Sequence, residues 1–233
     1  MEIELEGIVV IVGNYGSGKT EVAINLAVDR RQAGWDVSLA DLDLVNPYFR
    51  TREAMDTMKR LGVDLVLPEK QYLAADLPIL SPAVAGLIKN PVRLTILDVG
   101  GDDAGATVLA ALADAFGSRK LRVLQVVNPF RPYTDSVSGC RMIGAKIERA
   151  SGLSINGIIA NPNLIDETTA VLISEGYQFA ARLAAESGLP LELMAIAEDL
   201  LPAVDTAGYT CPVLKIRRQL VPPWKQAALL AAG

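Results

Sequence analysis

Eight residues near the amino terminus constrain the chain most, because residues 13–20 read Gly-Asn-Tyr-Gly-Ser-Gly-Lys-Thr. They match the pattern G-x-x-x-x-G-K-[ST], in which a glycine-rich turn wraps backbone N–H groups around a phosphate. The apolar, β-branched run at residues 8–12 is typical of a strand buried on both faces. Residues 20–27 then carry apolar residues at helical spacing. A strand, a glycine loop and a helix in this order predict a nucleotide-phosphate site, and they disfavour the alternative of a turn that binds nothing.

The motif gives its residues distinct roles. The Lys19 ammonium is expected to reach the β- and γ-phosphates and to act in catalysis, while the Thr20 hydroxyl is expected to bind Mg²⁺. The expected cofactors are therefore Mg²⁺ and a nucleoside triphosphate. The residues expected to contact the nucleotide here are Gly13, Asn14, Tyr15, Gly16, Ser17, Gly18, Lys19, Thr20 and Glu21.

Composition excludes several other kinds of site. The chain has no histidine, which rules out histidine acid–base catalysis, Ser-His-Asp triads and the usual zinc sites. Its net charge of −5 argues against nucleic acid as the main partner. Cys140 and Cys211 are expected to be reduced and buried. An acidic start at residues 1–4 and the lack of a long apolar run predict a cytoplasmic protein without a membrane role.

Strand-like and helix-like segments alternate along all 233 residues. This alternation predicts one α/β domain, 1–233, with three α/β/α layers and a mostly parallel sheet of seven to eight strands. The expected strands are 8–12, 36–40, 63–67, 92–97, 122–127, 154–160, 191–195 and 213–216. The expected helices are 18–33, 50–60, 104–116, 133–150 and 167–186, with a broken helical region at 73–90.

Acidic residues follow two of these strands. Asp41 and Asp43 stand at alternate positions after the second strand, so only one of them can face the phosphates directly. Asp98 ends the fourth strand, which is the form of a Walker B strand whose carboxylate holds Mg²⁺ or a metal-bound water. Gly101 lacks a Cβ, so its backbone N–H can approach the γ-phosphate. The expected metal ligands are Thr20, Asp43 and Asp98; the alternative is that such acids are solvated or cap a helix.

Together these motifs resemble the MinD/ParA/ArsA group of P-loop NTPases, in the SIMIBI class that also includes the cobyrinate and dethiobiotin synthetases. The resemblance spans about residues 8–213 and rests on the phosphate loop, on the two acidic motifs, and on the segments 195–199 and 207–213. It implies that Asp43 orients the attacking water and that Asp98 supports the metal. It further implies that the late loop with Asp199 packs beside the nucleotide base.

The chain departs from this family at the phosphate loop. Regulatory members carry a signature lysine that reaches the partner subunit's phosphates, and here that position is Asn14, with Tyr15 replacing a glycine. Asparagine can donate a hydrogen bond but brings no charge. Arg50 or Arg52, just beyond Asp43, is one hypothesis for the missing positive charge; the alternative is that both are solvated.

The base is expected to be read from the end of the 154–160 strand. Asn161 can both accept from and donate to an adenine edge, and the chain has no N-K-x-D guanine signature. We therefore expect ATP rather than GTP. The alternative for Asn161 is that it forms a turn before Pro162.

The resemblance implies a slow, Mg-dependent ATPase that acts as a switch on an unidentified partner protein, as a homodimer. One alternative is an ATP-dependent kinase or synthetase of the dethiobiotin or cobyrinate type, which phosphorylates a small-molecule carboxylate. Another is a nucleotide-sensing interaction protein with negligible turnover, which the missing signature lysine makes credible.

Overall fold

A single eight-stranded sheet forms the centre of the protein. The computed structural model describes residues 1–43, 55–67, 82–101 and 103–220. The strand order is β3-β2-β4-β1-β5-β6-β7-β8, and each neighbouring pair is parallel. The expected α/β architecture with a mostly parallel sheet of seven to eight strands is confirmed.

Strands and helices alternate along the chain. The strands are β1 (Gly7–Val12), β2 (Val37–Asp41), β3 (Asp64–Val66), β4 (Leu94–Asp98), β5 (Leu121–Val127), β6 (Gly157–Ala160), β7 (Leu191–Ala197) and β8 (Val213–Ile216). The α-helices are α1 (Lys19–Gln32), α2 (Met55–Arg60), α3 (Pro82–Lys89), α4 (Asp103–Ala111), α5 (Ala113–Phe116), α6 (Val137–Ser151) and α7 (Ala170–Ser187). Two 3₁₀ segments, η3 (Ile165–Glu167) and η4 (Glu198–Ala203), follow β6 and β7.

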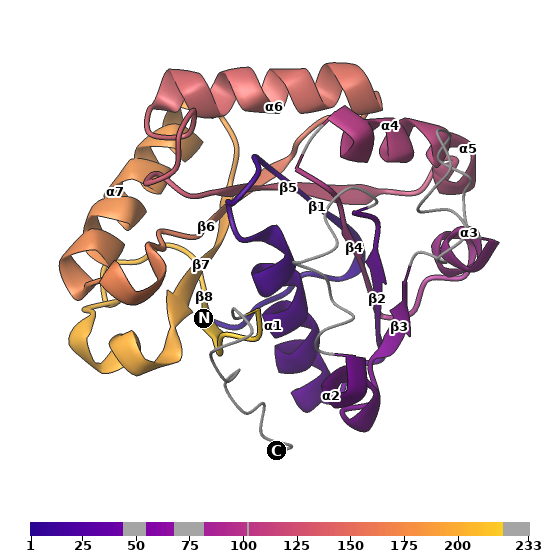
Figure 1. Ribbon diagram of the computed structural model, residues 1–233, viewed down its shortest axis with the longest axis horizontal. Helices are drawn as coiled ribbons and strands as arrows, with labels where there is room; N and C mark the ends of the chain where they lie inside the picture. The colour runs from indigo at the N-terminus through magenta and orange to yellow at the C-terminus, as the bar shows by residue number, and fades with distance from the viewer. Residues whose placement is uncertain (44–54, 68–81, 102, 221–233) are drawn as a thin grey trace.

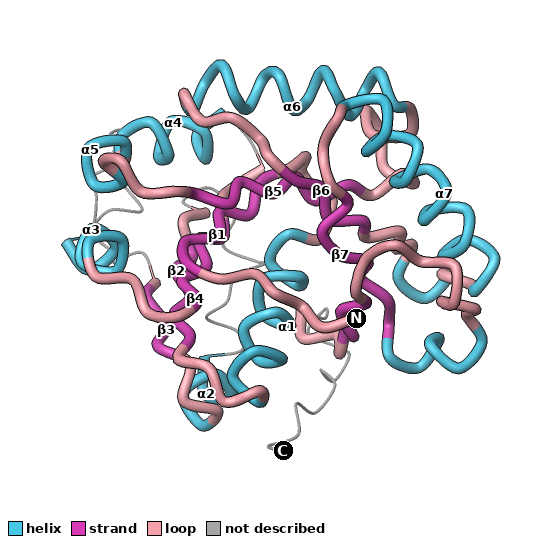
Figure 2. The backbone as a smooth tube through the Cα atoms, turned by 180° about the vertical axis from the view of Figure 1, so that it is seen from behind, coloured by secondary structure: helices cyan, strands magenta, loops and turns pink. Residues whose placement is uncertain are grey.

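Helices cover both faces of the sheet because successive strand residues point to opposite sides. In β1, Val9 and Ile11 pack in the core with α1, whereas Val10 and Val12 pack in the core with α3, α4 and α5. Figure 1 shows α1 and α2 on one side of the sheet and α4, α5 and α6 on the other. The tube view in Figure 2 shows the strands as a central band between these helices. None of the helices in the described ranges is long and apolar enough to cross a membrane.

Several element boundaries differ from the sequence-based expectation. Helix α6 begins at Val137 instead of residue 133, because Ser136 caps it by accepting a hydrogen bond from the Gly139 N–H. Strand β6 begins at Gly157 instead of residue 154. Just before it, the Val123 N–H of β5 donates to the Asn156 side-chain oxygen and not to a backbone carbonyl, although the Asn156 N–H still donates to the Val123 carbonyl. The helix expected at 104–116 is divided at Leu112, whose N–H donates to both Val108 and Leu109 carbonyls.

Some expected elements lie partly outside the described residues, and one observed element was not expected. Within the region expected to be helical at 73–90, α3 is observed, and residues 73–81 lie outside the described ranges. The same holds for residues 50–54 of the helix expected at 50–60. The 3₁₀ segment η4, which contains Pro202, was not expected from the sequence. Cys140 and Cys211 are free and buried, as expected.

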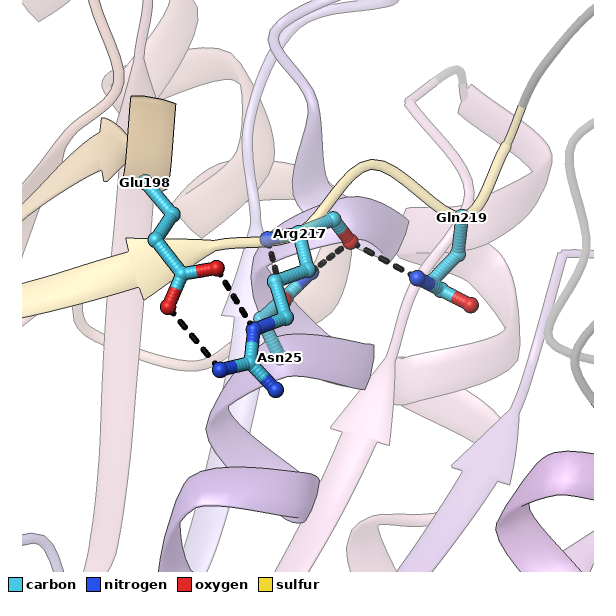
Figure 3. Close-up of polar contacts among 4 residues, drawn as sticks. All are labelled: Asn25, Glu198, Arg217 and Gln219. Atoms are coloured by element: carbon cyan, nitrogen blue, oxygen red, sulfur yellow. Dashed lines mark hydrogen bonds and ion pairs between the residues drawn. The ribbon is translucent and has the colours of Figure 1, made fainter. Parts of the chain in front are cut away.

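The segment after β8 is fastened to the start of α1. The Glu21 carboxylate accepts hydrogen bonds from the backbone N–H groups of Gln219 (2.7 Å) and Leu220 (3.0 Å). Asn25, one turn later, accepts from the Arg217 N–H at 2.8 Å. Figure 3 shows Arg217 between Asn25 and Glu198, with its guanidinium in a two-point ion pair to the Glu198 carboxylate. Helix α1, which begins at the phosphate loop, is therefore hydrogen-bonded to the segment that follows β8.

Replacing Glu21 with Gln should lower the free energy of unfolding by about 1–3 kcal/mol. Burial raises the pKa of this carboxyl, and the backbone N–H groups of Leu220 and Gln219 lower it by donating to the charged form. A Gln amide turns one acceptor oxygen into a donor, so one buried N–H loses its partner. Denaturant unfolding measures the change. Glu175→Gln on the exposed face of α7 is the control and should change stability by less than about 0.5 kcal/mol. Equal effects of the two substitutions would contradict a stabilising role for the hydrogen bonds between Glu21 and the segment after β8.

Candidate functional site

The predicted site residues meet where parallel strands end. Because β1, β2 and β4 are parallel neighbours, their carboxyl ends lie at one edge of the sheet. Asp41 pairs in register with Asp98, and Asp98 pairs with Ile11, two residues before the phosphate loop. The loop, the Asp41–Asp43 motif and the Asp98–Gly101 motif therefore converge at this edge.

At two positions in the loop only glycine fits, because any side chain would clash with a neighbouring group. Gly13 has φ +146°, and a Cβ there would lie 2.5 Å from the Val126 carbonyl oxygen of β5. Gly18, the N-cap of α1, has φ +89°, and a Cβ there would collide with the Asn161 side-chain amide. The left-handed backbone of Gly18 ends the turn and starts the helix, so that the N–H groups of the first turn point toward the loop.

Lys19 lies inside the loop. Its side chain is buried, with the residue 8% exposed, and its ammonium donates to the Asn14 carbonyl oxygen at 3.1 Å. Gly101 packs directly against this arrangement, because a Cβ there would lie 2.7 Å from Lys19 Nζ and 2.8 Å from the Tyr15 backbone nitrogen. The motif after β4 therefore closes over the loop at the position where the sequence predicted a terminal phosphate.

Asp98 is a buried carboxylate suited to a cation. It is 1% exposed, and among the described residues no group meets either of its oxygens in hydrogen-bonding geometry. Burial raises its pKa to about 6; the nearby Asp43 raises it further, whereas the Thr20 hydroxyl and the Lys19 ammonium lower it. A buried carboxylate left unsatisfied is costly unless a cation or donor joins it.

The residues predicted as metal ligands fit Mg²⁺. The neutral Thr20 hydroxyl lies near enough to Asp98 to lower the pKa of its carboxyl, whereas the charge of Asp43 raises that pKa. The Asp43 N–H donates to Asp41 Oδ1 at 3.0 Å. In the described ranges no cluster of three or more His, Cys, Asp or Glu side chains could hold a metal alone. Mg²⁺ typically takes one or two protein oxygens and completes its shell with phosphates and water. Thr20 and Asp98 are therefore the residues that would hold it, with a bound triphosphate supplying further oxygens, and ligation by Asp43 stays a prediction.

Three asparagine side chains link the loops around the site. The Asn14 amide donates to the Pro132 carbonyl (3.0 Å) in the loop after β5. The Asn128 amide, in that same loop, donates to the Asn163 carbonyl (2.7 Å) after β6. The Asn161 amide donates back to the Ser17 carbonyl (2.7 Å) of the phosphate loop. The three contacts form a closed circuit, which we call the asparagine circuit.

Some predicted contacts lie elsewhere in the structure. The Glu21 carboxylate is occupied by the segment after β8, so only its backbone N–H remains to face a phosphate. Asn161 uses its amide N–H on the loop, which leaves its carbonyl oxygen for a base. Asp199 is exposed on η4 and, among the described residues, shares no hydrogen bond or ion pair with the phosphate loop. Arg50 and Arg52 lie outside the described residues.

Two further residues lie near the site. Arg131 was not singled out from the sequence, and the Asn128 loop was expected only to line a substrate pocket under the kinase or synthetase alternative. Asn128 is 1% exposed and links two loops, and Arg131 reaches the phosphate loop, because its Nε is 4.0 Å from where a Gly16 Cβ would lie. The signal was the sequence Asn-Pro-Phe-Arg-Pro directly after β5, at the edge where binding loops of parallel sheets lie.

Replacing Gly101 with Ala should weaken nucleotide binding at least about 10-fold, because a Cβ there displaces the Lys19 ammonium and the Tyr15 backbone. The control is Gly86→Ala in α3, where a Cβ meets nothing within 4 Å. That substitution should leave affinity unchanged and stabilise the helix by about 0.5–1 kcal/mol. Calorimetric titration with nucleotide and thermal unfolding measure both effects. Equal affinity in the two variants would contradict the predicted contact.

Replacing Asp98 with Asn should stabilise the metal-free protein at pH 8 but not at pH 4.5. The pKa of Asp98 is about 6 when folded, above the ordinary 3.8. The folded state therefore holds this proton more tightly, and stability is lost as pH rises from about 4 to about 6. Asn carries no charge to bury, so a gain on the order of 1–3 kcal/mol is expected at pH 8. Urea unfolding in EDTA at both pH values measures it, and a pH-independent effect would contradict the raised pKa.

Comparison with known proteins places the fold and nothing finer. No protein-family model matches the sequence, and no curated protein is similar enough to match. Cell division protein FtsY from Thermotoga maritima is 19% identical, with TM-score 0.56, over 84% of this chain and 64% of that one. The signal recognition particle 54 kDa protein from Aeropyrum pernix, in complex with GDP, is 18% identical, with TM-score 0.56, over 83% of this chain and 42% of that one.

A third solved structure is nearer in length. The nucleotide-binding protein from Archaeoglobus fulgidus, in complex with ADP, is 20% identical, with TM-score 0.50, over 84% of this chain and 83% of that one. The chain thus spans less than two thirds of the FtsY and 54 kDa chains. These similarities establish that the chain has the α/β fold of P-loop NTPases.

Proposed function

We propose that the protein is a Mg-dependent nucleoside triphosphatase, selective for ATP, that works as a conformational switch on a partner protein. The observation that carries this proposal is the grouping of a buried Lys19, the Thr20 hydroxyl and the unsatisfied Asp98 carboxylate around one glycine loop. Phosphoryl transfer needs little beyond positioning and charge stabilisation, and these groups supply both.

Each residue has a distinct task in this proposal. Lys19 leaves the Asn14 carbonyl to bind the β- and γ-phosphates, and Gly101 lets the backbone after β4 come close to the terminal phosphate. Thr20 and Asp98 hold Mg²⁺, which when bound neutralises charge on the phosphates. Asp43, near Asp98, orients the attacking water. Loss of the terminal phosphate would remove the group toward which Asp43 directs this water, and this is the step that switches the protein.

The choice of base is part of the proposal. Among the similar structures, two were solved with GDP and one with ADP, so both nucleotide classes are bound on this fold. The sequence has no N-K-x-D motif, and no carboxylate stands at the end of β6, where Ala160 is followed by Asn161 and Pro162. We therefore assign ATP, with Asn161 Oδ1 as the group left to accept from the adenine amino group.

Exposed tyrosines beside the site support the proposal that the protein forms a homodimer. Tyr15 and Tyr133 are 64% and 67% exposed on the two loops that the Asn14–Pro132 hydrogen bond joins. Exposed aromatic side chains are common at protein interfaces. A second copy of the chain that covers these tyrosines would also shield the nucleotide from solvent. The cytoplasmic location and the identity of the partner protein stay predictions.

The first measurement is ATP and GTP turnover with Mg²⁺, beside size-exclusion chromatography with and without a non-hydrolysable analogue. Slow ATP hydrolysis and dimer formation on analogue binding are expected. Lys19→Ala and Asp43→Ala should each lower the turnover number about 100-fold or more, because they remove phosphate-charge stabilisation and water orientation. Lys120→Ala, on the exposed segment before β5, is the matched control and should leave turnover unchanged.

Other outcomes distinguish the alternatives. Hydrolysis that appears only with a small carboxylate would favour the dethiobiotin-type kinase or synthetase. Nucleotide-dependent dimerisation without turnover would favour a sensing protein, which is consistent with Asn14 at the position of the signature lysine. Absence of nucleotide binding by the wild-type chain would refute all three.

A further inference from the structure

The phosphate loop has little positive charge for the ligand it is built to hold. Residues 13–20 contain one charged side chain, that of Lys19, and Asn14 and Tyr15 on the same turn are neutral. The acids Asp41, Asp43 and Asp98 stand at the same sheet edge. A nucleoside triphosphate with one Mg²⁺ keeps about two negative charges. A further cation near the loop would therefore strengthen binding.

Arg131 lies where such a cation is needed. It belongs to the loop after β5, and its Nε is the nearest atom, at 4.0 Å, to the position that a Gly16 Cβ would occupy. Gly16 is the middle of the phosphate loop and has φ +73°. The neighbouring Pro132 carbonyl accepts the hydrogen bond from the Asn14 amide. The loop that carries Arg131 is thus bonded to the loop that holds the phosphates.

The Arg131 guanidinium lacks a partner in the described structure. Its Nε is buried and donates no hydrogen bond, and among the described residues no ion pair includes Arg131. A buried guanidinium N–H without an acceptor is costly, and such groups call for a ligand that supplies one. Guanidinium presents its donors in a planar fork that matches two phosphate oxygens.

The backbone at Arg131 is fixed before any ligand arrives. Its N–H donates to the Asn128 carbonyl at 3.2 Å, and its own carbonyl accepts from both the N–H and the hydroxyl of Thr134. Thr134 is fully buried, and its hydroxyl also donates to the Asn128 carbonyl at 2.7 Å. Only the side-chain torsions of Arg131 remain to be set on binding, which limits the entropy cost.

We propose that Arg131 donates guanidinium N–H groups to the phosphates of the nucleotide bound by its own chain, supplying the positive charge that residue 14 lacks. This inference rests on the proposed function, since it deepens the assignment of the same nucleotide site. It makes Arg131 a specificity-determining residue for phosphorylated ligands, with no requirement for a second subunit.

The test is calorimetric titration of three proteins: the wild type, Arg131→Ala and Arg131→Lys. Each is titrated, with Mg²⁺ present, with ADP or GDP, whichever the wild type binds. Each is also titrated with the matching nucleoside. Arg131→Ala should weaken the diphosphate Kd about 10- to 100-fold and leave nucleoside binding unchanged. Arg131→Lys should recover part of the loss, because it restores the charge without the fork. Arg141→Ala, exposed on α6, is the matched control and should match the wild type.

Three results would overturn the inference while leaving the proposed function intact. One is an unchanged diphosphate Kd for Arg131→Ala. Another is equal loss of nucleoside and diphosphate binding with a lower Tm, which would show a structural role. The third is a loss that appears only at concentrations where size-exclusion chromatography shows a dimer, because the guanidinium would then act on the partner subunit's nucleotide. A wild-type chain that binds neither diphosphate would instead refute the proposed function itself.

Discussion

The asparagine circuit is the interaction on which the rest of the site depends. Parallel strands bring three loops to one edge of the sheet, but strand pairing ends before the loops begin and cannot position them. Asn14, Asn128 and Asn161 do so with side-chain amides that donate to carbonyl oxygens of the next loop. The amide is short and uncharged, so each hydrogen bond holds the loops close at a small entropy cost. The three loops are therefore joined to one another directly, and not only through the sheet.

A site prepared for a cation carries a stability cost in the metal-free protein. Asp98 is enclosed by the strands beside it, and burial raises its pKa to about 6. The same burial strengthens the attraction to a metal ion, because charges interact more strongly where water is excluded. Elsewhere the structure compensates for a buried carboxylate internally: Glu21 is also enclosed but receives backbone N–H groups from the segment after β8. Asp98 has no such donors among the described residues, and this contrast supports the proposal that it faces a bound cation.

Most of the fold followed from periodicity, since buried parallel strands are short apolar runs and the helices between them are long enough to show a 3.6-residue repeat. The boundaries failed where a side chain replaced a backbone bond, as at Asn156 before β6 and Ser136 before α6. The phosphate loop and Asp98 were predictable because local patterns define them. The contacts of Arg131 and Asn128 were not predictable, since they join loops more than 100 and 30 residues apart along the chain, respectively. Single-sequence patterns contain no such pairing.

Asn14 and Arg131 are best understood together, because a hydrogen bond joins the loops that carry them. A lysine at this position would bring charge, but its four-carbon stem holds an attached loop less rigidly than an asparagine amide does. With Asn14 bonded to Pro132, the adjacent Arg131 is held against Gly16, and the charge enters from the loop after β5. In this arrangement the positive charge of Arg131 and the hydrogen bond from Asn14 that holds its loop belong to the same chain. The proposed role of Arg131 therefore does not depend on the proposed homodimer.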